Sequence, residues 1–147
     1  MSVESGTTGR FFLDTNIFVY SFDLSASRKS QLAKKLIRQA LLTRKGVISY
    51  QVVQEFSNVA SRKFSEPLTP IELRQYLSTV LVPLLGVHSS PALFSEALTL
   101  QHEHQLSWYD SLIVASAIQA QCSLLLSEDL QHGRKFGNLR IENPFVE

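Results

Sequence analysis

Short apolar runs alternate with longer segments of helical periodicity along this chain of 147 residues, and that alternation constrains its fold most strongly. The runs have the length of buried strands, and the segments between them repeat apolar residues at helical spacing. The predicted strands cover residues 10–13, 47–49, 84–87, 123–126 and 139–142, and the predicted helices cover residues 16–22, 28–44, 51–63, 70–80, 91–104 and 107–121. Strands that alternate with helices favour a parallel sheet flanked by helices, with right-handed crossovers. We therefore predict one α/β domain whose central parallel sheet has about four or five strands.

The composition is that of a globular chain. Hydrophobic residues make up 44% and charged residues 18% of it, which excludes intrinsic disorder. The longest apolar runs, residues 81–87 and 112–118, are far shorter than the ~20 residues of a membrane span. Cys122 is the single cysteine and cannot form an internal disulfide, and residues 1–9 lack the apolar core of a signal peptide. We expect a cytoplasmic domain over residues 10–147 that follows a flexible leader at residues 1–9.

Basic residues are concentrated in one predicted helix, although the formal net charge of the chain is only +1. Residues 28–45 carry seven of the 14 basic side chains, including Lys34, Lys35 and Arg38, and residues 24–54 contain no acid. A local excess of this size attracts phosphate groups. It is equally compatible with a solvated helix face.

Four acids stand at the ends of predicted elements. Asp14 and Asp129 follow the first and fourth strands, whereas Glu55 and Asp110 lie on predicted helices. Glu55 is at the margin of an apolar helix face, and Asp110 is near the start of a helix that is apolar around most of its circumference. Functional groups collect at the carboxyl ends of the strands in open α/β sheets. We expect the four acids to converge at that edge.

Each acid also has a purely structural interpretation. Asp14 can form an Asx-turn, Asp110 can cap its helix, and Glu55 can form a salt bridge with Arg62 or Lys63. Several carboxylates in one pocket, in contrast, repel one another, and a divalent cation relieves that repulsion. Ligands that are all oxygen suit Mg²⁺ or Mn²⁺ better than zinc.

Four segments that carry these acids resemble the signature segments of PIN-domain nucleases. They are Phe-Phe-Leu-Asp14-Thr15-Asn16, Gln51-Val-Val-Gln-Glu55-Phe, Trp108-Tyr-Asp110-Ser-Leu-Ile-Val-Ala-Ser-Ala and Leu125-Leu-Ser-Glu-Asp129-Leu. The resemblance extends over nearly the whole chain and is greatest to the VapC-like ribonuclease toxins of type II toxin–antitoxin pairs. It implies a PIN-like fold.

The resemblance also assigns roles to individual residues. It implies that Asp14 and Asp110 bind the metal directly, and that Glu55 and Asp129 complete the site directly or through water. Asp129 has the acidic neighbour Glu128, and the family's pattern favours Asp129 as the residue that faces the site. Three further residues, Thr15, Asn16 and Ser127, would hold the carboxylates in position.

The implied activity is hydrolysis of RNA phosphodiester bonds by a Mg²⁺-dependent endoribonuclease, with Mn²⁺ as an alternative metal. The implied partners are an RNA substrate, a small antitoxin that covers the acids, and a second copy of the chain in a homodimer. Contacts to the RNA backbone would come from the basic helix, through Lys34, Lys35 and Arg38.

Two other functions are compatible with these residues. A PIN fold can bind RNA or a protein without cleaving it, although four acids in the signature positions argue against that function. A phosphatase or phosphotransferase could use Asp14 as its nucleophile. That chemistry usually requires a second Asp two residues further on, where this chain has Asn16.

Overall fold

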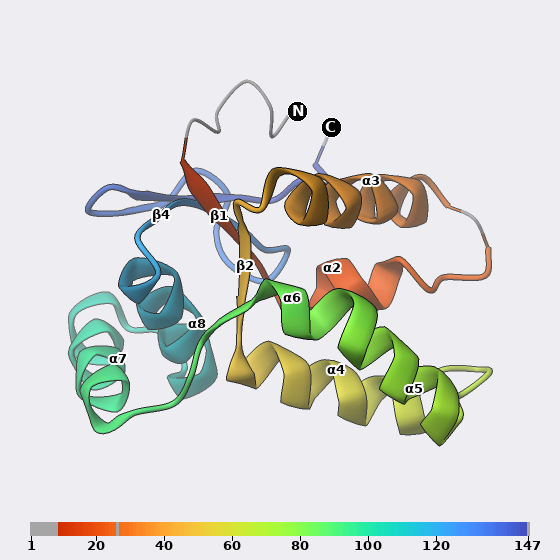
Figure 1. The fold of residues 1–147 in the computed structure, drawn as a ribbon. Helices are drawn as coiled ribbons and strands as arrows, with labels where there is room; N and C mark the ends of the chain where they lie inside the picture. Colours follow the sequence, from red (N-terminus) through yellow and green to blue (C-terminus); the bar gives the residue numbers. More distant parts are fainter. Residues whose placement is uncertain (1–8, 26, 147) are drawn as a thin grey trace.

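The fold is built on one six-stranded sheet, in the order β3-β2-β1-β4-β6-β5 (Figure 1). The computed structural model describes residues 9–25 and 27–146. The strands are β1 (Arg10–Leu13), β2 (Gly46–Ser49), β3 (Leu85–Val87), β4 (Cys122–Leu126), β5 (Lys135–Phe136) and β6 (Leu139–Glu142). Neighbouring strands run parallel from β3 to β6, and only β5 runs antiparallel, against β6. The predicted α/β class and parallel sheet are confirmed.

The strand that the sequence did not reveal is β5. It has only two residues, and Gly137 turns the chain back into β6 with a φ of 60°. A strand this short has no alternating pattern to detect, so the sheet has six strands where about four or five were predicted. Because β5 lies at the edge, its addition does not alter the parallel order of the other five strands.

Helices lie on both sides of the sheet. They are α2 (Thr15–Tyr20), α3 (Arg28–Thr43), α4 (Tyr50–Arg62), α5 (Pro70–Tyr76), α6 (Val82–Leu84), α7 (Pro91–His104) and α8 (Trp108–Gln119), with a π-helical turn, η1 (Leu77–Leu81), between α5 and α6. Figure 1 places α7 and α8 to one side of β2, and α2, α3 and α5 to the other. Each crossover takes the chain back to the amino edge, so the parallel strands all end at the same carboxyl edge, where functional groups can meet.

The helix predicted at residues 70–80 is interrupted by a wider turn. It continues through η1 and α6 to Leu84, and Pro83 lies within α6. Proline has no backbone N–H and its ring clashes with the carbonyl four residues before it, here that of Thr79. The π-helical turn at residues 77–81 accommodates this proline without ending the helical segment.

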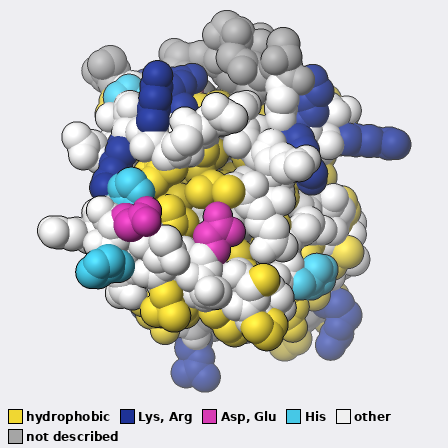
Figure 2. All heavy atoms as spheres, turned by 90° about the vertical axis from the view of Figure 1, so that its left-hand side faces the viewer, with side chains coloured by type: hydrophobic (Ala, Val, Ile, Leu, Met, Phe, Trp, Pro, Cys, Tyr) yellow, Lys and Arg dark blue, Asp and Glu magenta, His cyan; other side chains and the backbone are white. Residues whose placement is uncertain are grey.

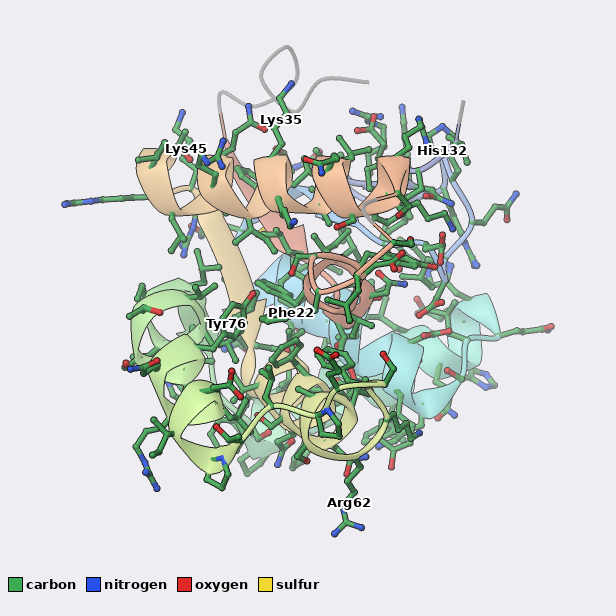
Figure 3. The ribbon with its side chains drawn as sticks, turned by 90° about the vertical axis from the view of Figure 1, so that its right-hand side faces the viewer. Phe22, Lys35, Lys45, Arg62, Tyr76 and His132 are labelled. Carbon is green, nitrogen blue, oxygen red and sulfur yellow. The ribbon has the colours of Figure 1, made fainter. Side chains whose placement is uncertain are left out.

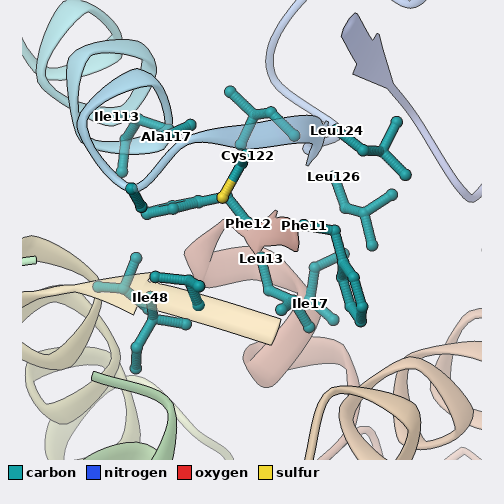
Figure 4. Packing of buried hydrophobic residues seen from close by; sticks show 14 of the residues in the cluster. Phe11, Phe12, Leu13, Ile17, Ile48, Ile113, Ala117, Cys122, Leu124 and Leu126 are labelled. Atoms are coloured by element: carbon teal, nitrogen blue, oxygen red, sulfur yellow. The ribbon is translucent and has the colours of Figure 1, made fainter. Parts of the chain in front are cut away.

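The core is formed by the central strands and the helices that cover them (Figure 4). Phe11, Phe12 and Leu13 of β1 are buried, and so are Leu124, Leu125 and Leu126 of β4. Cys122 lies in the same cluster, and burial raises the pKa of its thiol to about 11 despite the opposing charge of Arg10. This packing fixes β1 and β4 side by side, with Leu13 paired to Leu126 at their carboxyl ends.

A second group of aromatic rings holds the outer helices together. Phe22 contacts Phe56, Phe64 and Tyr76 at ring-centroid distances of 4.9 to 5.7 Å. Figure 3 shows Phe22 and Tyr76 facing each other below α3. These contacts connect the segment after α2 to the middle of α4, to the segment after α4 and to α5.

Two findings concern the ends of the chain and the membrane. No helix in the part of the chain that the structure describes is long and apolar enough to cross a bilayer. The leader predicted at residues 1–9 falls almost entirely outside the described residues, which begin at Gly9.

Candidate active site

The four predicted acids occupy the carboxyl edge of the sheet. Asp14 directly follows β1 and is the N-cap of α2, and Asp129 follows β4, the neighbour of β1. Glu55 is on α4, which begins where β2 ends, and Asp110 is in the first turn of α8. The strand order explains their proximity, because β2, β1 and β4 are consecutive in the sheet.

Asp14 is the most enclosed of these acids, with only 5% of its surface exposed. Its Oδ1 accepts a hydrogen bond of 2.7 Å from the Thr15 backbone N–H, and its Oδ2 accepts one of 2.7 Å from Ser127 Oγ. The Asp129 backbone N–H in turn donates to Ser127 Oγ over 3.1 Å. Ser127 therefore connects the segments that carry Asp14 and Asp129.

Glu55 is held by two polar side chains. Thr15 Oγ1 donates to its Oε1 over 2.7 Å, and Gln51 Nε2 lies 3.5 Å from its Oε2. The same Gln51 amide donates to the Tyr109 carbonyl over 3.3 Å, next to Asp110. Gln51 thus joins α4 to the first turn of α8.

The electrostatic environment shows that the acids act on one another. Burial raises the pKa of Asp14 to about 7, against the hydrogen bonds from Ser127 and Thr15, and the charges of Asp129 and Glu55 raise it further. Burial also raises the pKa of Asp129, followed by the charges of Asp110, Glu128 and Glu55. The carboxylates are thus close enough to disfavour simultaneous ionisation.

The purely structural interpretations are met only in part. Asp14 does cap α2. The cap of α8 is Ser107, whose Oγ accepts from the Asp110 N–H, so Asp110 is not the capping residue. Glu55 is bound by Thr15 and Gln51 instead of pairing with Arg62 or Lys63, and Figure 3 shows Arg62 extending away from the fold.

Glu128 is engaged outside this group of acids. Tyr20 Oη donates to its Oε1 over 2.5 Å, and Lys29 Nζ forms an ion pair with its Oε2 over 2.6 Å. The Lys29 ammonium also lies 4.7 Å from the centre of the Tyr20 ring and 5.6 Å from that of Phe145. This arrangement could not be predicted from the sequence, because Lys29 and Glu128 are 99 residues apart in the chain.

The predicted positioning residues lie beside the acids. Thr15 and Ser127 make the hydrogen bonds described above, and Ser127 is fully buried. Asn16 is in the first turn of α2, and its Oδ1 is buried without a hydrogen-bond partner among the described residues. Gln51 was not predicted, although its position one helical turn before Glu55 was a usable signal.

The residues predicted to contact RNA do not all face the same part of the surface. Lys34, Lys35 and Arg38 are all exposed on α3. Lys34 and Arg38 line a pocket of about 370 Å³ together with Phe22 and Tyr76, whereas Figure 3 shows Lys35 directed away from those rings. None of the three is among the groups that shift the pKa of Asp14 or Asp129.

The oxygen atoms of the site are chemically suited to bind a hard divalent cation, although they do not surround a single point closely. Within the described residues, no three Asp, Glu, His or Cys side chains are grouped tightly enough to hold an ion as they stand. The available ligands are carboxylate oxygens, joined by the unpartnered amide oxygen of Asn16. Oxygen ligands of this kind fit Mg²⁺ or Mn²⁺.

Fold and site together define the chain as a parallel α/β protein with an acidic carboxyl edge. A model of the PIN domain family matches residues 11–135. The chain therefore belongs to the PIN domain family, as the four segments had indicated. None of the curated protein sequences matches it.

Solved structures share this fold at low sequence identity. A toxin–antitoxin complex from Klebsiella pneumoniae is 19% identical with a TM-score of 0.62, and the match covers 91% of this chain and 97% of that one. VapBC2 from Rickettsia felis, bound to a DNA fragment from its promoter, is 21% identical with a TM-score of 0.61 over 90% and 97% of the two chains. VapC20 from Mycobacterium tuberculosis, a toxin that cleaves the sarcin–ricin loop, is 16% identical with a TM-score of 0.58 over 81% and 91%.

Proposed function

We propose that this PIN domain is a divalent-metal-dependent endoribonuclease whose metal is held by Asp14, Glu55, Asp110 and Asp129. The observation that carries the proposal is the burial of Asp14 among other acids. Its pKa is raised to about 7, and no Lys or Arg within the described residues forms an ion pair with it. An uncompensated buried carboxylate is costly, and a cation removes that cost.

The residues of the site have separate tasks in this proposal. A bound Mg²⁺ or Mn²⁺ supplies an activated water and offsets charge on the phosphoryl group. Asp14 and Asp110 are direct ligands, and Glu55 and Asp129 act directly or through water. Ser127 and Thr15 donate the hydrogen bonds that orient the Asp14 and Glu55 carboxylates. Asn16 stands beside Asp14 as a further polar group.

The biological role proposed is that of a toxin in a type II toxin–antitoxin pair. Support comes from the toxin–antitoxin complexes that share the fold. A small antitoxin would cover the acids with a basic side chain, and two copies of the chain would form a homodimer. We propose that the protein acts on RNA in the cytoplasm, with Lys34, Lys35 and Arg38 in contact with the phosphate backbone.

Cleavage of a panel of structured RNAs tests the proposal. The wild type, Asp110→Asn and Glu103→Gln are compared with Mg²⁺, with Mn²⁺ and with EDTA. We expect discrete cuts that require metal and fall at least about 100-fold in Asp110→Asn, since even the residues behind metal ligands contribute 10–100-fold. Glu103 is an exposed acid on α7 and makes a matched control, so its variant should cleave like the wild type.

Other results would redirect the assignment. Equal cleavage by the wild type and Asp110→Asn would remove the acids from the reaction. Binding of RNA by both proteins without metal-dependent cleavage would favour a non-catalytic binding module. Hydrolysis of a small phosphomonoester, without action on RNA, would favour the phosphatase interpretation.

A further inference from the structure

A small pocket lies next to the parts of α4 and α8 that carry Glu55 and Asp110. The start of α4, the segment after β3, and helices α7 and α8 enclose a volume of about 210 Å³. Gln51 forms part of its wall, and the same Gln51 amide contacts Glu55 and the carbonyl of Tyr109. The pocket and the acids therefore share a residue.

Exposed aromatic rings surround this pocket. Tyr109 is 64% exposed, Tyr50 is 45% exposed and Phe94 is 41% exposed. The Tyr50 ring lies 5.8 Å from that of His88, and the Phe94 ring lies 6.2 Å from that of Trp108. Exposed aromatic rings are the side chains on which unpaired bases stack.

The polar residues that line the pocket are serines, glutamines, tyrosines and one histidine, His88. None of the described residues that line it is Asp, Glu, Lys or Arg, so it offers no carboxylate to a basic peptide side chain and no ammonium or guanidinium group to a phosphate. Ser49 Oγ and Gln51 Oε1 are buried without a hydrogen-bond partner within the described residues. Ser49 is the N-cap of α4, yet its hydroxyl makes no capping bond to the helix.

The pocket beneath α3 provides the contrast. It is larger, about 370 Å³, and two cationic side chains, Lys34 and Arg38, line it. Basic residues also lie around the periphery of the face that bears α7 and α8, where apolar side chains gather in the centre and along the lower edge (Figure 2). The Lys and Arg side chains that could bind phosphate groups thus lie outside the small pocket. The small pocket suits a neutral planar group with hydrogen-bonding edges.

From this geometry we infer that the pocket bounded by Tyr50, Gln51, His88, Phe94 and Tyr109 binds one unstacked nucleobase of the RNA, next to the bond that the acids cleave. The inference rests on the proposed function, because it takes RNA as the substrate. Tyr109 and Tyr50 supply stacking faces, and the amide of Gln51 is near enough to contact both the base and the reacting centre.

Binding measured without cleavage tests the inference. Fluorescein-labelled decamers of A, of U and of C, and an abasic decamer with the same phosphates, are titrated with protein in EDTA and followed by anisotropy. Stacking of one base on an aromatic ring strengthens binding by about 5- to 100-fold. We expect the wild type to prefer at least one base-containing decamer over the abasic one by a factor in that range.

Variants identify the rings responsible. Tyr109→Ala and Tyr50→Ala should lose most of the preference for bases, whereas Tyr109→Phe should retain it because the ring remains. Leu98→Ala is the control, since Leu98 is exposed on α7 but does not line the pocket. The abasic decamer should bind the wild type and all variants equally.

Three results would overturn the inference. One is metal-dependent cleavage of RNA with equal binding of abasic and base-containing decamers, which leaves the proposed nuclease standing. Another is conversion of a dimer to a monomer by Tyr109→Ala in light scattering, which assigns the ring to a subunit contact. A third is the absence of RNA binding altogether. Retained base preference without any cleavage, in contrast, supports the pocket and contradicts the proposed nuclease.

Discussion

Glu128 and Asp129 are adjacent in the chain, but their surroundings shift the pKa of the two carboxyl groups in opposite directions. Burial disfavours the charge of Glu128, yet the hydrogen bonds from Lys29 and Tyr20 and the charge of Lys29 hold its pKa below the ordinary value. Asp129 has the reverse balance, because burial and three neighbouring carboxylates raise its pKa. One region contains its own cation, and the other does not.

The comparison shows that the two regions surround their acids with different groups. Where an acid has only a structural task, the chain supplies a lysine and two aromatic rings around it. Around the carboxylates of Asp14 and Glu55 it supplies two hydroxyls, one amide and one backbone N–H group instead. Such donors orient carboxylates without neutralising them, which leaves the charge available to a cation from solution.

Substitution of Asp14 by Asn should give the largest effect on stability. Its folded pKa of about 7 lies above the ordinary 3.8, so the unfolded chain releases the proton first as the pH rises. Wild-type stability in EDTA should therefore fall between about pH 4 and pH 7, and Asp14→Asn should lack this fall. At pH 8 we expect the variant to be more stable by on the order of a few kcal/mol, and at pH 4 the two should be equal.

Urea denaturation across this pH range measures the difference. Parallel curves for the two proteins would show that burial does not shift the pKa of Asp14. Addition of Mg²⁺ at pH 8 provides an internal check, because a ligand that binds only the folded state stabilises it. The wild type should gain stability, and Asp14→Asn should gain less.

Gly46→Ala should produce a smaller loss of stability that is independent of pH. Gly46 begins β2 at the opposite end of the strand from the acids, and a Cβ there would overlap that of Ala40 and lie 2.8 Å from its Cα. Overpacking of this kind costs about 1–3 kcal/mol. Thermal melts at pH 5 and pH 8 should show equal losses. A loss confined to one pH would mean that the substitution reaches the acids.

Glu128→Gln should have the smallest effect. The Lys29 side chain is 41% exposed, so loss of its ion pair should lower the melting temperature only slightly. Metal-dependent cleavage should stay far above that of Asp129→Asn, because Glu128 faces Lys29 and Tyr20 rather than the acid site. If the two variants lose activity equally, the roles of these neighbouring acids are not separate.

The fold was predictable because burial leaves a regular trace in the sequence. Residues 11–13 and 124–126 are apolar on both faces, as central parallel strands must be, and α3 repeats its apolar side chains at helical spacing. The helix expected to reach residue 44 is followed by Gly46, a glycine that is typical of a helix end. The helix ends as predicted, but Arg44 adopts the left-handed conformation, with a φ of 59°, and Gly46 is needed for its close approach to Ala40.

The rest depended on contacts between distant residues. The choice between Glu128 and Asp129 depends on Lys29, which the fold brings to Glu128 from the start of α3. The positions of Asp14 and Ser127 on neighbouring strands allow their hydrogen bond, which strand order alone determines. The place of the four acids at the carboxyl edge was predictable from the ends of the predicted strands and helices. The directions of their side chains were not. Their role in binding metal stays a prediction.

The buried thiol of Cys122 has a practical consequence for studying this molecule. It is the single cysteine, only 5% exposed, and the raised pKa of about 11 keeps it protonated and therefore unreactive toward maleimides at neutral pH. A cysteine introduced at an exposed position such as Leu98 would be the one site that accepts a dye. Fluorescent reporters can thus be attached to the wild-type background without removing any native residue from the core.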